Sequence, residues 1–310
     1  MYVTNKIKSL NFDFIFVVSN KILNLNLIIK SYQFIKMYRI FFYCLFISLL
    51  SNAQNKRFVY EYSFAEDSTH IEIQAKEFLN LDIGKQGSQF YSSDIIEQDS
   101  LVKIKERPIG KYPYEGIKYL DVIIKNYPSF DINFYTSCRG YYKANLDKKL
   151  DWKILPEKDK ILGYLVQKAT TVLYNRKWTV WFTPDIPIQD GPYFFHGLPG
   201  LIIKAEDQNN SISFNLVGIK SFNHFDISEI PYYFKLDTVK ITENDLKKLL
   251  RNYLDKPSPK LNNEYGDVKQ VFYDGNGKKV SSAEFYRITE QNNKNALKKR
   301  NNLLRWDITK

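Results

Sequence analysis

The residues best suited to chemistry in this chain gather in one short loop, GPYFFHGLPGLI, at residues 191–202. The loop holds His196, and an imidazole can act as a general base near neutral pH. Such a base also needs a nucleophile and an acid that orients the ring, whereas Asp185 and Asp190 are neighbours in sequence alone. The sequence therefore predicts that a ring nitrogen of His196 bonds the backbone of its own loop, and it identifies no catalytic residue.

The sequence predicts no metal site and no cofactor. A metal site needs several ligands, and neither His70 nor His224 has a spacing that pairs it with His196. The segment DGNGKK at 274–279 begins like a calcium loop, but Lys278 stands where an oxygen ligand is needed, so we expect a turn. A Walker loop, a CxxC pair and the GxSxG, HExxH and dinucleotide-binding motifs are all missing from the sequence.

The loop is stiff and apolar. Between residues 184 and 200, four prolines fix φ, while three glycines allow positive φ or close backbone approach, and we expect a positive φ at Gly197 or Gly200. A structureless connection is rarely longer than ~12–15 residues, so this one is packed or functional. We expect its aromatic residues to cap one end of the sheet. Alternatively the loop is a gate, and its candidate binding residues are Trp181, Asp185, Pro187, Gly191, Pro192, Tyr193, Phe194, Phe195, His196, Gly197, Leu198, Pro199 and Gly200.

Alternating apolar residues predict strands from residue 57 to about 220. FVYEYSF places every second residue from Phe58 to Phe64 on one face. KATTVLY and KWTVWFT predict a hairpin about Asn175-Arg176, and LIIKAE and ISFNLVGI predict another across DQNNS. Short returns of this kind indicate an antiparallel meander, and an aromatic content of 16% suits a pleated sheet.

Helices are expected after the strands. TENDLKKLLRNYL, at 242–254, opens with a Thr242 and Asp245 pair that resembles a capping box, and its leucines share one stripe. A second helix is expected at about 283–300. The predicted fold is mainly β: an antiparallel curved sheet or open half-barrel over residues 54–235, with one or two C-terminal helices in a region, 236–310, that packs partly on the sheet.

The N-terminus resembles a secretory signal peptide. MYRIFFYCLFISLLSNA, at 37–53, has a charged start, then an apolar run, and ends in small residues. This layout predicts cleavage before Gln54. The apolar run is shorter than the roughly 20 residues that span a bilayer. Because this segment begins with a methionine, Met37, we interpret residues 1–36 as a start-site extension. The mature chain is then periplasmic or secreted and does not span the membrane.

Charge and cysteine content agree with export. The whole chain carries +11, and residues 54–310 carry +6, because six Lys or Arg and one Asp precede Gln54. This moderate charge is spread along the chain, so nucleic acid is not an expected partner. Once Cys44 is removed with the signal peptide, Cys138 stands alone, which rules out an internal disulfide, and we expect it to be buried.

The segment ILGYLVQKATTVLYNRKWTVWFTPDIPIQDGPYFFHGLPGLIIKAED, from about Ile161 to Asp207, resembles the signature of the GLPGLI family. The resemblance implies an exported protein of the Gram-negative envelope with no established activity. Members usually carry a cysteine where this chain has Val166, so any role of that cysteine is absent here. The order of strands and turns also looks like the LolA and RseB lipid-handling half-barrels, which is an analogy of topology.

Two classes of function follow from these observations. The first is a non-catalytic binding or envelope-assembly protein, whose partner is an apolar small molecule, a lipid or an envelope protein. The alternative is a periplasmic hydrolase or isomerase that uses the motif loop. A binder should have an apolar cavity with few polar groups, whereas an enzyme should bring titratable residues with shifted pKa values together.

Export is testable at the N-terminus. The protein isolated from its native host should begin at Gln54 or a near neighbour, because signal peptidase cleaves after the small residues that end the apolar run. Intact-mass and peptide mass spectrometry would measure this. Recovery of peptides from residues 1–36 in the mature protein would contradict the prediction.

Overall fold

The computed structural model describes residues 32–39, 55–95, 98–99, 117–138, 140–223, 225–236, 238–256, 272–302 and 304. The chain divides into two compact units, Met1–Ala53 and Gln54–Lys310. In the first unit, residues 32–39 form an exposed helix. Within the described ranges, no helix combines the length and the apolarity that crossing a membrane requires. Most of the expected signal peptide, its cleavage point at Gln54, Cys44 and His224 lie outside these ranges.

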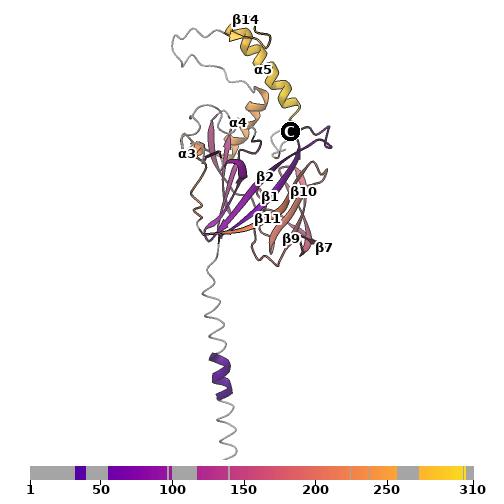
Figure 1. Ribbon diagram of the computed structural model, residues 1–310, viewed down its shortest axis with the longest axis vertical. Coiled ribbons are helices and arrows are strands. Elements are labelled where there is room, and N and C mark those ends of the chain that lie inside the picture. The colour runs from indigo at the N-terminus through magenta and orange to yellow at the C-terminus, as the bar shows by residue number, and fades with distance from the viewer. Residues whose placement is uncertain are drawn as a thin grey trace, which may run out of the picture. The chain divides into compact units, whose positions relative to one another are not determined.

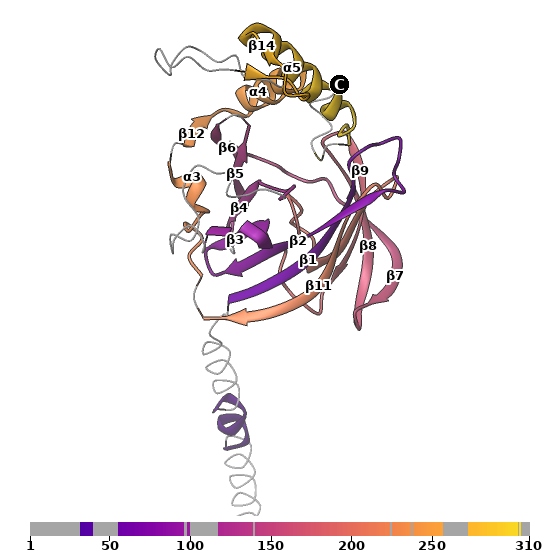
Figure 2. The same ribbon diagram turned by 45° about the horizontal axis from the view of Figure 1, so that its top comes forward.

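The second unit is built on one open, curved sheet (Figures 1 and 2). In the described part of the chain it has 12 strands, in the order β12-β6-β5-β4-β3-β2-β1-β11-β10-β9-β8-β7. Neighbouring strands are antiparallel except for β12, which runs parallel to β6. The mainly β fold with a curved, unclosed sheet and C-terminal helices is confirmed. The strands are β1 (Asn55–Ala65), β2 (Gln74–Gly84), β3 (Gly87–Ser92), β4 (Val122–Asn126), β5 (Asp131–Ser137), β6 (Tyr141–Leu146), β7 (Lys153–Ile161), β8 (Tyr164–Leu173), β9 (Arg176–Thr183), β10 (Leu201–Asp207), β11 (Ile212–Phe222) and β12 (Thr238–Ile241).

One face of the sheet carries the main core. The alternation seen in the sequence is confirmed on β1, where Phe58 and Tyr60 have no exposed surface, and on β11, where Ile212 and Phe214 have none. Since successive side chains of a strand point to opposite faces, these residues lie together on one side. The residues of β8 to β11 form the antiparallel meander that the sequence predicts.

The hairpin between β8 and β9 turns one residue earlier than expected. Tyr174 and Asn175 form the turn with φ values of 52° and 59°, and Arg176 already belongs to β9. Two successive positive φ values are the mark of a type I′ turn, whose twist matches that of the flanking strands. Asparagine tolerates this conformation, but tyrosine seldom does, which is why the sequence placed the turn around Asn175 and Arg176.

The helices follow their capping signals. α4 (Glu243–Asp255) begins after Thr242, whose Oγ1 accepts a hydrogen bond from the Asp245 N–H at 3.1 Å, so the predicted cap is confirmed. α5 (Ser282–Lys298) begins after Ser281, whose hydroxyl accepts from the Glu284 N–H. Both helices lie at the same end of the sheet (Figure 2). The turn expected at 274–279 joins a small hairpin, β13 (Phe272–Tyr273) and β14 (Lys279–Val280).

A second, smaller core lies on the other face of β3 to β5. There Val122, Ile124 and Tyr135 pack with Tyr233 and Phe234 of α3 (Tyr232–Leu236). Sequence analysis did not predict α3 or β12, because each is too short to show a periodic pattern. Cys138 is buried, as expected.

The chain after α5 is fixed to the sheet by a buried polar cluster. Asn302 donates from Nδ2 to the Ala65 carbonyl at 2.8 Å, and its Oδ1 accepts from Arg176 Nη2 at 2.8 Å. Arg176 also forms an ion pair with Asp207, whose carboxylate accepts from the Ser211 N–H and hydroxyl. The C-terminal end of α5 is therefore held beside β1, at the end of the sheet where α4 and α5 both lie.

Candidate functional site

The motif loop connects Thr183, at the end of β9, to Leu201, at the start of β10, and it is packed into the core. Tyr193 and Leu198 are each 1% exposed, and Phe194 and Phe195 have no exposed surface. The aromatic residues among them contact rings of the sheet. The ring centroids of Phe195 and Trp178 are 5.0 Å apart, and those of Tyr193 and Phe214 are 6.2 Å apart. The expected burial of these aromatic residues is confirmed, and the loop caps the sheet.

A buried ion pair holds this cap. Lys125 of β4 and Asp190 of the loop pair with no exposed side-chain surface on either residue. The Lys125 ammonium also donates to the carbonyl oxygens of Gly191, Tyr193 and Phe195 at 2.7, 3.2 and 3.2 Å. An ammonium has three N–H donors, and the carboxylate and the three carbonyls together offer four acceptors, so every donor is satisfied. Burial lowers the pKa of Lys125, and the charge of Asp190 opposes that shift.

The Asp190 carboxylate is equally well satisfied. Besides Lys125, it accepts hydrogen bonds from the Ser88 hydroxyl at 2.5 Å, from the Tyr127 hydroxyl and from the Gly191 N–H at 2.7 Å. Burial, followed by the charge of Asp190, raises the pKa of Tyr127. Three elements, β3, the end of β4 and the loop, thus meet at one carboxylate.

Two glycines of the loop allow this close packing. Gly200 has a φ of 151°, and a Cβ there would lie 2.0 Å from the carbonyl oxygen of Thr183. Gly197 has a φ of 90°, a left-handed conformation that glycine adopts without steric cost. The expected positive φ is therefore confirmed.

The His196 side chain contacts the backbone of its own loop. Its Nδ1 lies 3.0 Å from the Phe194 carbonyl, and its ring stacks on Phe130 at 4.7 Å between centroids. The predicted bond between a ring nitrogen and the loop backbone is confirmed. Burial, then the charge of Lys125, lowers the pKa of His196 from 6.5 to about 4, while Asp190 opposes the shift. The imidazole is therefore neutral at physiological pH.

The predicted binding residues are spread over interior and surface. Asp185, Pro187, Gly197 and Pro199 are exposed, Trp181 is half-buried, and the others are buried. None of them lines either of the two hollows described below. That these residues bind a ligand stays a prediction. Among the described residues, no group of three or more His, Cys, Asp or Glu could hold a metal ion.

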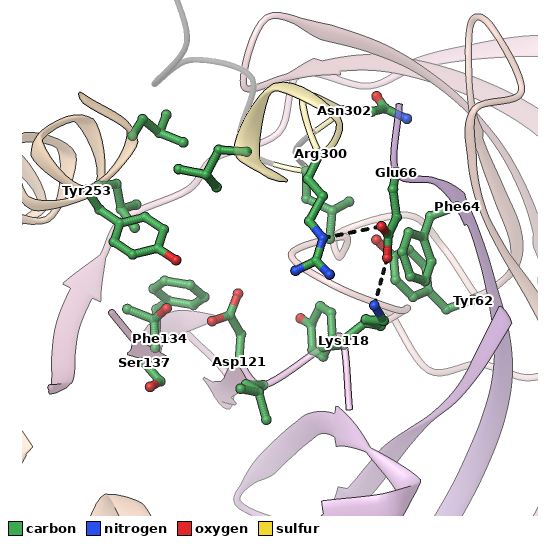
Figure 3. A pocket seen from close by; sticks show the side chains of 17 residues that line it. Tyr62, Phe64, Glu66, Lys118, Asp121, Phe134, Ser137, Tyr253, Arg300 and Asn302 are labelled. Carbon is green, nitrogen blue, oxygen red and sulfur yellow. Dashed lines mark ion pairs between the residues drawn. The ribbon is translucent and has the colours of Figure 1, made fainter. Parts of the chain in front are cut away.

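A cavity of about 340 Å³ lies between the sheet and the C-terminal helices (Figure 3). Tyr62 and Phe64 of β1 and Phe134 of β5 line it from the sheet side. Leucines of α4 and Leu297 of α5 line it from the helix side. Its charged lining residues are Glu66, Lys118, Asp121 and Arg300.

Within that lining, Glu66 pairs with two cations. Its carboxylate lies 2.9 Å from Lys118 Nζ and 3.3 Å from Arg300 Nε. The hydrogen bond from Lys118 lowers the pKa of Glu66 from its usual value, and Arg300 adds to the effect. A second hollow, of about 550 Å³, lies over β8 and β9 and is lined mostly by polar residues such as Lys153, Thr170 and Gln208. The apolar cavity is thus the one under the helices.

A family model described as a protein of unknown function (Porph_ging) matches residues 171–204. This stretch contains β9 and the motif loop and ends within β10. No curated protein matches the chain.

Solved structures show low similarity to this chain. Two crystal forms of PNGF-II have TM-scores of 0.46 and 0.45 at 17% identity, over 73% of this chain. The match covers 39% of the length of PNGF-II. A candidate outer membrane lipoprotein-sorting protein domain from Vibrio parahaemolyticus has a TM-score of 0.26 at 8% identity, over 57% of this chain and 88% of that domain. Likenesses of this size carry no argument about function.

Sequence analysis did not identify Lys125, which holds the motif loop, or the charged residues Glu66, Lys118 and Arg300, which line the cavity. Lys125 has a signal that could have been used, since it is a lysine inside the apolar strand VIIKN. A charged residue in a buried strand must have a partner, and that partner could have been sought among the acids of the loop. Glu66, Lys118 and Arg300 are far apart in the chain, and the sequence holds no pattern that joins them.

The ion pair predicts a large loss of stability on one substitution. Lys125→Met should lower the free energy of unfolding by about 3–5 kcal/mol, because it leaves Asp190 buried without a compensating charge. Urea denaturation monitored by tryptophan fluorescence would measure the change.

The matched control is Lys76→Met on β2. Lys76 also pairs with a glutamate, Glu61, at 2.9 Å, but 61% of its side chain is exposed. Exposed pairs contribute at most about 1 kcal/mol, so this variant should be nearly as stable as the wild type. Equal losses in the two variants would show that the buried pair does not hold the cap.

His196 predicts a pH dependence. Its folded pKa, about 4, lies below the unfolded value of 6.5. As the pH falls through this range, the unfolded state takes up the proton first, so stability is lost between pH 6.5 and 4. His196→Gln should remove on the order of 2–3 kcal/mol of the loss measured between pH 7 and pH 4. Parallel stability profiles for variant and wild type, measured by urea denaturation at each pH, would contradict the prediction.

Proposed function

We propose that this protein is an exported, GLPGLI-type envelope protein that binds an apolar molecule and does not transform it. The signal-like segment at 37–53 and the motif at 191–202 support export and the family resemblance. The binding site that we propose is the cavity between the sheet and helices α4 and α5.

The composition of that cavity carries the proposal. Its volume of about 340 Å³ falls within the usual range for small-molecule sites, roughly 300–1,000 Å³. Aromatic rings of β1 and β5 face leucines of α4 and α5 across it, and the charged residues are few. Apolar walls with a small number of polar groups are typical of sites that bind and orient a ligand.

The enzyme alternative depends on the cluster around Asp190. Lys125, Tyr127 and His196 have shifted pKa values there, a feature that active sites often share. However, Lys125 and Asp190 have no exposed surface, and their hydrogen bonds go to the loop and to neighbouring strands. A substrate would have to displace the cap to reach them. This cluster therefore supports a structural role better than a catalytic one.

Co-purification tests the proposal. Protein purified from its native host and extracted with organic solvent should release an apolar molecule in near-stoichiometric amount, detected by mass spectrometry. Leu254→Gln places an amide in the lining and should reduce the amount severalfold, because burying an unpaired polar group is costly.

Leu249→Gln is the control, since Leu249 lies on the same helix and does not line the cavity. Circular dichroism would verify that both variants fold. If the wild type releases no apolar molecule, or if both variants release the wild-type amount, the cavity is not the binding site.

A further inference from the structure

On one side of the cavity, spare hydrogen-bond donors lie beside a carboxylate that is already paired with two cations. Glu66 receives Lys118 on Oε1 and Arg300 on Oε2, so both of its oxygens are engaged. Arg300 reaches Glu66 through Nε, and within the described ranges its two Nη groups make no hydrogen bond. A guanidinium has five N–H donors, and four of them therefore remain available.

The positions of these donors fit a ligand's polar end. Figure 3 shows Arg300, Lys118 and Glu66 together on one side of the cavity, with Phe134 and Tyr253 on the other side. Arg300 and Lys118 are 55% and 41% exposed, so a ligand can reach them without any rearrangement of the core. Asp121, the other acid of the lining, already has an interaction partner in the chain.

We propose, on the basis of the function proposed above, that the cavity binds a single-chain amphiphile with an anionic oxygen head group, a carboxylate or a phosphate. The chain lies between the aromatic residues of β1 and β5 and the leucines of α4, and the head group accepts hydrogen bonds from Arg300 and Lys118. Guanidinium groups match carboxylate and phosphate oxygens in a two-pronged geometry, which favours them over an uncharged head group.

Three probes test the head group: dodecanoate, whose twelve carbons include the carboxyl carbon, and dodecyltrimethylammonium and uncharged dodecyl maltoside, whose alkyl chains have twelve carbons, each below its micelle concentration. Calorimetry on the purified protein, after removal of bound apolar molecules, would measure each affinity. Dodecanoate should bind about fivefold tighter than the others, the upper end for partly exposed charge pairs, and the preference should shrink at high salt. Shortening the carboxylate by one methylene should weaken binding about fourfold.

Variants assign the preference to residues. Arg300→Gln and Lys118→Gln should each reduce the preference for dodecanoate and leave dodecyl maltoside binding unchanged. Glu66→Gln should strengthen dodecanoate binding, since it removes the acid that competes for the same donors. Arg287→Gln is the matched control, because Arg287 is an exposed arginine of α5 that does not line the cavity.

The outcomes separate this inference from the proposed function. Equal affinity for dodecanoate and dodecyl maltoside, or tighter binding of dodecyltrimethylammonium, would overturn the anionic head group and leave the apolar binding site intact. If none of the three probes binds, both proposals fail. If inorganic phosphate binds as tightly as dodecanoate, the alkyl chain contributes nothing to the affinity, the site binds anions alone, and the amphiphile is excluded. A phosphate ester of dodecanol that binds as tightly as dodecanoate would extend the assignment to phosphate heads.

Discussion

Lys125 and Asp190 are both fully buried, and a charge taken out of water costs several kcal/mol unless a partner and hydrogen bonds compensate for it. Here the compensation comes from the backbone of the motif loop, because three of its carbonyls point at one ammonium. The loop can adopt that shape since Gly197 and Gly200 take conformations that other residues avoid. The pair, the glycines and the fixed φ values of the prolines therefore form one interdependent arrangement.

A row of stacked aromatic rings connects this arrangement to the cavity. Held by Lys125, Tyr193 lies parallel to Phe214, and Phe214 in turn stacks on Tyr62 at 4.9 Å between ring centroids. Tyr62 is also a lining residue of the cavity. A continuous row of aromatic rings thus runs from the motif loop to the cavity. The loop itself does not line the cavity and reaches it only through this row of rings.

Much of the fold could be predicted because its signals are local. Alternation on β1 and β11, the two hairpins of the meander and the capped helices each depend on residues within one element. The strand β7 shows where such signals fail, since KILPEKDKI carries Pro156 and five charged residues. These residues are tolerated because β7 is the last strand of the sheet, and an edge strand benefits from proline and charge that discourage pairing with other chains. Whether a strand lies at an edge is a property of the whole sheet.

The candidate site was less predictable than the fold for the same reason. The motif at 191–202 concentrates glycine, proline and aromatic residues, and its aromatic residues are accounted for by packing in the core. An unusual local sequence is therefore evidence of a demanding fold position and says little about chemistry. The cavity is assembled from β1, the segment before β4, α4 and the residues after α5, none of which is unusual by itself. What brings their side chains together around one cavity is the anchoring of Asn302 to the Ala65 carbonyl, which holds Arg300 beside Glu66.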